Sequence, residues 1–99
     1  RGYRIELGEI ETALYAHPAM VECAVIPVPD DTVTNKLHAH VVVKEDIKQS
    51  ELVRFISQRV PRYMIPDAFH FESLLPKTST GKIDRQALMS REEVPSSGR

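Results

Sequence analysis

VECAVIPVPD at residues 21–30 and LHAHVVVK at residues 37–44 are the two stretches that decide the fold. The first has β-branched and small apolar residues in both alternating phases, which predicts a strand covered on both faces. Its prolines, Pro27 and Pro29, predict that the strand lies near a sheet edge and that its pairing ends there. The second stretch alternates apolar residues at odd positions with mostly polar ones, which predicts another strand. The polar residues between the two stretches are of the types that form turns. The sequence therefore predicts that the two strands pair as a β-hairpin.

Two amphipathic helices flank the hairpin. Residues 6–17, ELGEIETALYAH, carry apolar side chains at helical spacing, and their early glutamates favour a helix N-terminus. Residues 50–60, SELVRFISQRV, repeat the pattern, and Ser50 is expected to be the N-cap. A third strand is expected at residues 67–72, and Asp84 is expected to cap a short closing helix that ends at Leu88.

This order of elements predicts an α+β fold. We expect a small three-stranded sheet, plus a short N-terminal strand, with the amphipathic helices packed on one face. The chain has 99 residues, of which 41% are hydrophobic and 6% aromatic, so it can form one small domain with a modest core.

Charge and cysteine content exclude several classes of protein. The 13 basic and 14 acidic residues nearly cancel, so no broad cationic surface for nucleic acid or anionic lipid is expected. The single cysteine cannot form an internal disulfide, and no apolar stretch has the length of a membrane span. We therefore expect a cytoplasmic protein with no nucleic-acid or membrane partner. A first residue of Arg rather than Met indicates a fragment of a longer protein.

The segment PKTSTGKIDR at residues 76–85 places a single lysine, Lys82, after Thr80 and Gly81. Gly81 tolerates backbone conformations that a residue with a Cβ resists, so the loop is expected to be a flexible tether that brings a cation to a distant anion. It is not a Walker phosphate loop, because the upstream glycine and the following Ser or Thr are missing. Taken alone, this pattern favours an ordinary exposed loop lysine.

Three segments in order change that interpretation: RGYRIELGEIE at 1–11, VPRYMIP at 60–66 and LPKTSTGKIDRQAL at 75–88. Together they resemble the C-terminal subdomain of the adenylate-forming enzyme superfamily. That superfamily includes acyl- and aryl-CoA synthetases, firefly luciferase and the adenylation domains of nonribosomal peptide synthetases. RIELGEIE at 4–11 is most similar to the amino-acid-adenylating members. The resemblance implies that residues 1–88 form this subdomain and that the polar residues 89–99 form a tail or linker.

The resemblance implies a first step in which a carboxylate attacks the α-phosphorus of ATP, with Mg²⁺ present, and forms an acyl adenylate. By its match to the family's lysine, Lys82 would contact the carboxylate and the α-phosphate as negative charge gathers in the transition state. Thr80 and Gly81 would support the loop. The cleft that the lysine enters belongs to the N-terminal core subdomain, so this fragment alone is expected to be inactive.

A second step is implied, in which a thiol displaces AMP and forms a thioester. The subdomain would rotate and bring Gly2, Tyr3 and Arg4 to the tunnel for the phosphopantetheine thiol of an acyl or peptidyl carrier protein. Gly2 suits this position because a side chain would block close approach. The family's hinge residue would lie just before Arg1.

Two alternatives stay open beside an amino-acid-activating ligase. One is an acyl- or aryl-CoA ligase, in which free CoA replaces the carrier protein. The other is a non-catalytic binding module of the same fold, which the intact TSTGK loop argues against. The family's selectivity pocket lies in the large subdomain, so the acid that is activated stays open, as does a stand-alone or multimodular parent.

The remaining polar candidates have simpler interpretations. His38 and His40 share one strand face without a third ligand at useful spacing, which favours a solvent or interface face over a metal site. Cys23 is expected to be a small core residue rather than a nucleophile. Arg85 is expected to form a structural ion pair, with support of the lysine loop as the alternative. The glutamates of the first helix are expected on a solvated face: Glu6, Glu9 and Glu11.

Three large apolar side chains complete the predictions. They are expected to pack in the core or at a domain interface: Met64, Phe69 and Phe71.

Overall fold

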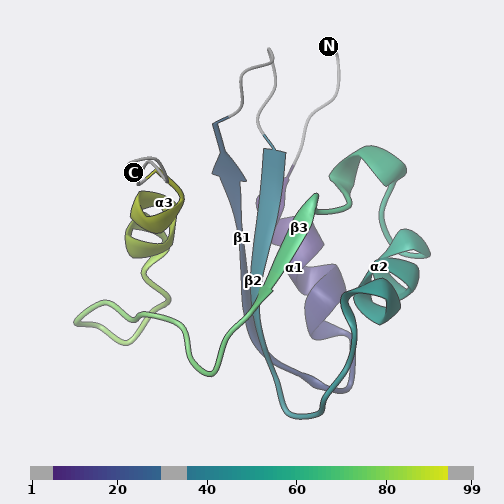
Figure 1. Ribbon diagram of the computed structural model, residues 1–99, viewed down its shortest axis with the longest axis horizontal. Coiled ribbons are helices and arrows are strands. Elements are labelled where there is room, and N and C mark those ends of the chain that lie inside the picture. Colours follow the sequence, from purple (N-terminus) through teal and green to yellow (C-terminus); the bar gives the residue numbers. More distant parts are fainter. Residues whose placement is uncertain (1–5, 30–35, 94–99) are drawn as a thin grey trace.

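The computed structural model describes residues 6–29 and 36–93, while residues 1–5, 30–35 and 94–99 lie outside the described part of the chain. The described residues form an α+β fold, as expected (Figure 1). The expected N-terminal strand and the turn of the hairpin fall on residues outside this part. The elements are α1 (Leu7–Tyr15), β1 (Met20–Val28), β2 (Lys36–Val43), α2 (Gln49–Ser57), a 3₁₀ helix (Arg62–Met64), β3 (Ala68–Phe71) and α3 (Arg85–Glu93).

The strands form one mixed sheet in the order β1-β2-β3. β1 and β2 pair antiparallel, with Val25 opposite Ala39, which confirms the predicted hairpin. β3 is the predicted third strand, and it pairs parallel to β2 with Phe69 opposite Ala39. The connection through α2 returns the chain to the end of the sheet where β2 began, which a parallel pair requires.

β1 is an edge strand. Backbone N–H groups on its outer edge, which faces away from β2, donate hydrogen bonds to side chains of α1. The Tyr15 hydroxyl accepts a hydrogen bond from the Cys23 N–H at 3.1 Å. A carboxylate oxygen of Glu11 accepts one from the Val25 N–H at 2.8 Å. An open strand edge is a template for unwanted pairing, so these contacts both anchor α1 and protect the edge.

The edge position predicted from Pro27 and Pro29 is confirmed, and β1 ends at Val28, before Pro29, but the predicted end of pairing at Pro27 is wrong. Pro27 lies opposite Leu37, and β1 continues to Val28. Pro27 lies two residues after Val25, whose amide faces away from β2, so the N–H that proline lacks would also have faced outward. A proline on this phase of an edge strand interrupts no bond of the ladder.

α1 and α2 cover one face of the sheet. Ile10 and Leu14 of α1, and Leu52 and Ile56 of α2, are fully buried at the predicted spacing of four residues. Burial of each such side chain contributes about 1.5–3 kcal/mol. They share the main core with strand and loop residues, which include Val25, Ala39, Val41, Met64 and Phe69. The core positions predicted for Met64 and Phe69 are confirmed.

The predicted N-cap of α2 is wrong. α2 begins at Gln49, after Lys48 in an extended conformation, and no side chain caps it. Ser50 therefore lies in the first turn. Ile47 packs against the main core just before the helix, and the chain enters the helix two residues earlier than the capping pattern indicated.

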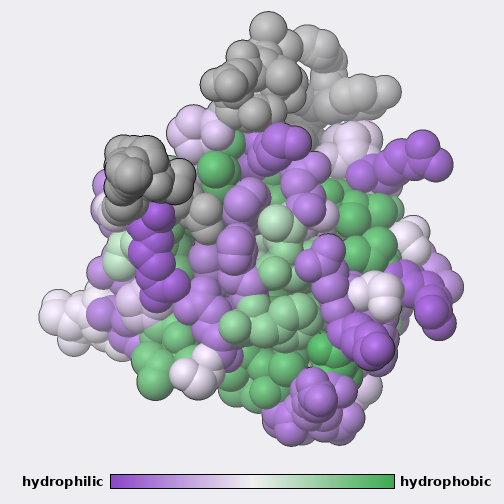
Figure 2. Space-filling view, in the orientation of Figure 1, coloured by the Kyte–Doolittle hydropathy of each residue, from purple (hydrophilic) through white to green (hydrophobic). Residues whose placement is uncertain are grey.

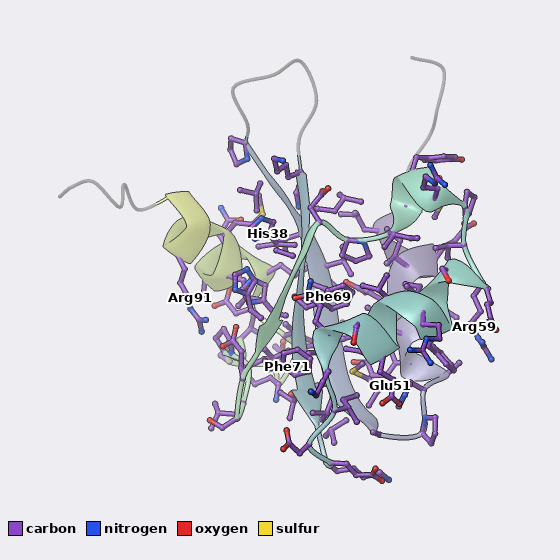
Figure 3. The ribbon with its side chains drawn as sticks, turned by 45° about the vertical axis from the view of Figure 1, so that its right-hand side comes forward. His38, Glu51, Arg59, Phe69, Phe71 and Arg91 are labelled. Carbon is purple, nitrogen blue, oxygen red and sulfur yellow. The ribbon has the colours of Figure 1, made fainter. Side chains whose placement is uncertain are left out.

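α3 lies on the opposite face, which corrects the prediction that all helices share one face. Leu88 of α3 packs in a second cluster with Ala24 and Ile26 of β1. β1 is thus buried on both faces, as its sequence predicted. Figure 3 shows Arg91 of α3 on one side of the sheet, and Glu51 of α2 and Arg59 just beyond α2 on the other. α3 also continues past Leu88 to Glu93.

Some large apolar side chains stay exposed. Phe71 at the end of β3 is 42% exposed and Leu74 just beyond it is 69% exposed. Figure 2 shows apolar surface gathered in the lower half of this face, between hydrophilic side chains. For Phe71 the domain-interface alternative stays a prediction. In the described part of the chain, no helix combines the length and apolar character that a membrane span needs.

Candidate functional site

Lys82 projects from an ordered hairpin rather than from a flexible tether. Lys77 and Ile83 form an antiparallel bridge. The Asp84 N–H donates to the Pro76 carbonyl at 2.8 Å, which closes the base of the hairpin. We refer to residues 76–84 as the lysine hairpin. Its backbone hydrogen bonds correct the expected flexibility, since each one restrains the loop.

Gly81 makes the tight end of the lysine hairpin possible. Its φ of +88° lies in the region that L-residues rarely adopt. Its N–H donates to the Thr78 carbonyl at 2.9 Å. The conformational role predicted for Gly81 is therefore confirmed, while its part in catalysis stays a prediction.

Thr78 supports the lysine more directly than the predicted Thr80. The Thr78 N–H donates to the Lys82 carbonyl at 2.7 Å, and the Lys82 N–H donates to the Thr78 hydroxyl at 3.3 Å. Thr80 contacts only the Thr78 hydroxyl, at 3.0 Å. The sequence signal for Thr78 was a hydroxyl residue four positions before the lysine, which permits such a side-chain turn.

Lys82 is exposed, and its ammonium group has no hydrogen bond or ion pair with any described residue. The hairpin therefore holds the lysine backbone while the charged end stays available. A cation presented in this way can stabilise negative charge that develops on a neighbouring phosphate or carboxylate.

The two ends of the lysine hairpin are attached to other elements by ion pairs. Lys77 Nζ lies 2.8 Å from Glu22 Oε2 of β1. Arg85 bonds both carboxylate oxygens of Glu11, with its Nη2 at 2.7 Å from Oε1 and its Nη1 on Oε2. This confirms the ion pair predicted for Arg85. The hydrogen bonds that the guanidinium donates to Glu11 raise the pKa of Arg85 above its usual value.

Glu11 corrects the prediction of a solvated glutamate face. Its side chain is only 12% exposed, because it lies between α1, the edge of β1 and Arg85. Asp84 is confirmed as a cap, since its Oδ1 accepts a hydrogen bond from the Ala87 N–H at 3.0 Å.

Cys23 is a core residue, as predicted. It is 1% exposed, and burial raises the pKa of its thiol to about 12. A thiol with such a pKa stays protonated at neutral pH and is a poor nucleophile.

The expected solvent or interface face of His38 and His40 is wrong for His40, which is 2% exposed. His40 stacks on His70 and bonds Glu72, which in turn bonds Arg91 of α3. Burial acts to raise the pKa of Glu72, but the hydrogen bonds from His40 and Arg91 lower it below its usual value. Strand β3 and helix α3 cover a position that local alternation placed outside.

The thiol-tunnel residues predicted from the first segment lie outside the described part of the chain. No placement is therefore assigned to Gly2, Tyr3 or Arg4.

Comparisons with known proteins agree with the fold. Residues 9–82 match the model of the AMP-binding enzyme C-terminal domain. Tyrocidine synthase 3 of Brevibacillus parabrevis is 43% identical over 97 residues, which cover 98% of this chain and 2% of that protein. The dimodular nonribosomal peptide synthase of Bacillus subtilis (strain 168) is 46% identical over 89 residues, which cover 89% of this chain and 4% of that protein.

Solved structures share the fold. The Brucella canis acyl-CoA synthetase superposes with a TM-score of 0.83 at 34% identity, over 92% of this chain and 18% of that chain. The chain thus spans only a small part of each protein that it matches. Since the family model matches most of its residues, and since the same fold and sequence recur in these proteins, the chain belongs to the AMP-binding enzyme C-terminal domain family of the adenylate-forming ligases.

Proposed function

We propose that this chain is the mobile C-terminal subdomain of a cytoplasmic, ATP-dependent ligase that activates an amino acid for nonribosomal peptide synthesis. The observation that carries the proposal is the exposed ammonium of Lys82 on an ordered hairpin, where it pairs with none of the residues that the structure describes. The identities of 43% and 46% to peptide synthases support an amino acid substrate over other acids.

In the first half-reaction, an oxygen of the substrate carboxylate attacks the α-phosphorus of ATP, and pyrophosphate leaves as the bond to the β-phosphate breaks. Lys82 would contact the carboxylate and the α-phosphate oxygens while their negative charges approach each other. Thr80 and Gly81, together with Thr78, would keep the lysine backbone in place. ATP would be bound mainly by the N-terminal core subdomain of the same enzyme.

Mg²⁺ would also be held outside these residues. The described ranges, 6–29 and 36–93, contain no group of three His, Cys, Asp or Glu side chains suited to a metal ion. The metal would therefore be held with the triphosphate by the core subdomain, and Lys82 would add its charge there.

In the second half-reaction, a thiol sulfur attacks the acyl carbonyl, AMP leaves, and a thioester forms. The acceptor would be the phosphopantetheine thiol of a carrier protein. The segment Gly2–Arg4 would line the thiol's path after the subdomain rotates, and Gly2 would leave room for it.

A CoA ligase is the second candidate, because the chain is 34% identical to an acyl-CoA synthetase in the solved structures. The two candidates differ in the acceptor thiol. The test incubates the enzyme that contains this chain with ATP, amino acids and either CoA or a holo carrier protein, and then measures product masses. An aminoacyl carrier protein is the expected product, whereas a CoA thioester would favour the second candidate. No adenylate with any acid would favour a binding module.

A further inference from the structure

Arg85, the residue that follows the lysine hairpin, is held by the largely buried carboxylate of Glu11 in α1, whose side chain is 12% exposed. Arg85 is three positions after Lys82, and Asp84 between them both closes the hairpin and caps α3. A displacement of Arg85 would therefore be transmitted directly to the backbone that carries the lysine.

Glu11 is a rigid partner for Arg85. Its Oε1 and Oε2 both accept hydrogen bonds from the guanidinium, and Oε2 also accepts the Val25 N–H at 2.8 Å. Arg85 Nη1 lies 3.5 Å from the Val25 carbonyl oxygen. The forked guanidinium geometry restricts orientation as well as distance, which a single lysine contact does not do.

The same pair connects the first and the last of the three segments that carry the sequence resemblance. Glu11 ends the segment 1–11, and Arg85 lies within the segment 75–88. The ion pair joins them across 74 positions of sequence, at the edge of β1. The lysine hairpin and α1 therefore form one unit through this contact.

We propose that Glu11 and Arg85 are positioning residues for Lys82 in the adenylation half-reaction. The pair fixes the position and orientation of the lysine hairpin relative to α1. Lys82 can then reach the reacting groups when the subdomain closes. This inference rests on the proposed function. A purely structural role for the pair would be to cover the edge of β1 and stabilise the fold.

The experiment compares Glu11→Gln, Arg85→Gln and the double variant in the enzyme that contains this chain. Glu11→Gln retains an oxygen that accepts the Val25 N–H, so the strand edge stays covered. Arg91→Gln is the matched control, because Arg91 is on the same helix and pairs with Glu72, away from the hairpin. Lys82→Ala is measured beside them to test the proposed function separately.

Positioning predicts a specific kinetic pattern. In each single variant the kcat of amino-acid-dependent pyrophosphate exchange falls by about 10- to 100-fold, because small misplacements of a catalytic group have effects of this size. The KM for ATP and thioester formation from supplied adenylate change less than about twofold, since ground-state binding and the second step do not use the pair. The double variant is no slower than the slower single variant, because both remove one contact.

Other patterns would overturn the inference. If Lys82→Ala abolishes exchange while Arg85→Gln exchanges at the normal rate, the positioning role fails and the proposed function stands. If both half-reactions fall together, or if Arg91→Gln has the same effect, the pair is structural. If Lys82→Ala exchanges normally, both proposals fail. If the glutamine variants do not fold, Arg85→Lys tests the positioning role instead, because it keeps the positive charge but lacks the forked guanidinium. Pyrophosphate exchange at the normal rate by Arg85→Lys would contradict the positioning role.

Discussion

Thr78 and Lys82 each donate a backbone hydrogen bond to the other. The Thr78 N–H donates to the Lys82 carbonyl at 2.7 Å, and the Lys82 N–H donates to the Thr78 hydroxyl at 3.3 Å. Together with the positive φ of Gly81, this pairing determines the shape of the lysine hairpin. It restrains the backbone of the lysine and leaves its ammonium group available.

Thr78→Val should weaken the support of Lys82. The change keeps the shape of the side chain but removes the acceptor for the Lys82 N–H, a neutral hydrogen bond worth about 0.5–1.5 kcal/mol. We expect pyrophosphate exchange to fall about 2- to 10-fold. Ser79→Ala is the control, because the exposed Ser79 side chain makes no hydrogen bond with the described residues. Equal rates for the two variants would mean that the Thr78 hydroxyl has no such role.

Lys82→Ala should separate the two half-reactions. Loss of a positioned charge donor typically costs about 100- to 1,000-fold in rate, so pyrophosphate exchange should fall by that amount. Thioester formation from supplied acyl adenylate should stay nearly normal. Lys44→Ala, which removes another exposed lysine, should leave both rates unchanged. A similar loss in both half-reactions would contradict the role assigned to Lys82.

Gly81→Ala tests the backbone conformation alone. A Cβ at Gly81 would meet no atom within 4 Å, so the cost comes from its φ of +88°. That cost is about 1–2 kcal/mol for an L-residue, and relief of the strain would move the hairpin and slow exchange. Gly8→Ala is the matched control, since a Cβ there also meets nothing and the helical position favours alanine. Thermal unfolding should show a lower Tm for Gly81→Ala than for Gly8→Ala; the reverse order would rule out the strain.

Gly2→Val should have the opposite kinetic effect to Lys82→Ala. A branched side chain near the thiol's path should slow transfer to the carrier protein by about 10-fold or more, while pyrophosphate exchange continues. Gly2→Ala, with a smaller side chain, should slow transfer less. Single-turnover transfer from preformed adenylate measures the effect, and unchanged transfer by Gly2→Val would exclude Gly2 from the thiol tunnel.

Cys23 should make stability depend on alkaline pH. Burial raises the pKa of the Cys23 thiol to about 12, so the folded protein keeps a proton that the unfolded chain releases above about pH 8.5. The contribution of the Cys23 thiol to the free energy of unfolding is complete below that pH. It is lost as the pH rises, at up to about 1.4 kcal/mol per pH unit. Urea unfolding between pH 7 and 10 measures the slope. Cys23→Ala should flatten it, and an equal slope in both proteins would assign the effect to other groups.

Local sequence patterns predicted most of the elements, while Lys82 was singled out by the resemblance of three segments to a known family. The spacing of apolar residues located the buried faces of α1 and α2. The residue patterns of the two strands, with polar residues between them, predicted the hairpin of β1 and β2. Gly81 was identified by the conformational freedom that its position needs. These predictions were correct because each depends on residues within a few positions of one another.

The errors lie where a residue's surroundings come from distant parts of the chain. Glu11 was expected in solvent, but it is largely buried and bonded to Arg85, 74 positions away. His40 was expected on a solvent or interface face, but it is 2% exposed, stacked on His70 of β3 and bonded to Glu72. By itself the sequence determined the strands and the helix faces, because periodicity and local backbone preference act over short distances, and the resemblance of three of its segments to a known family singled out Lys82 as a candidate. Only the tertiary structure decided which charges meet, because that depends on how the helices pack on the two faces of the sheet.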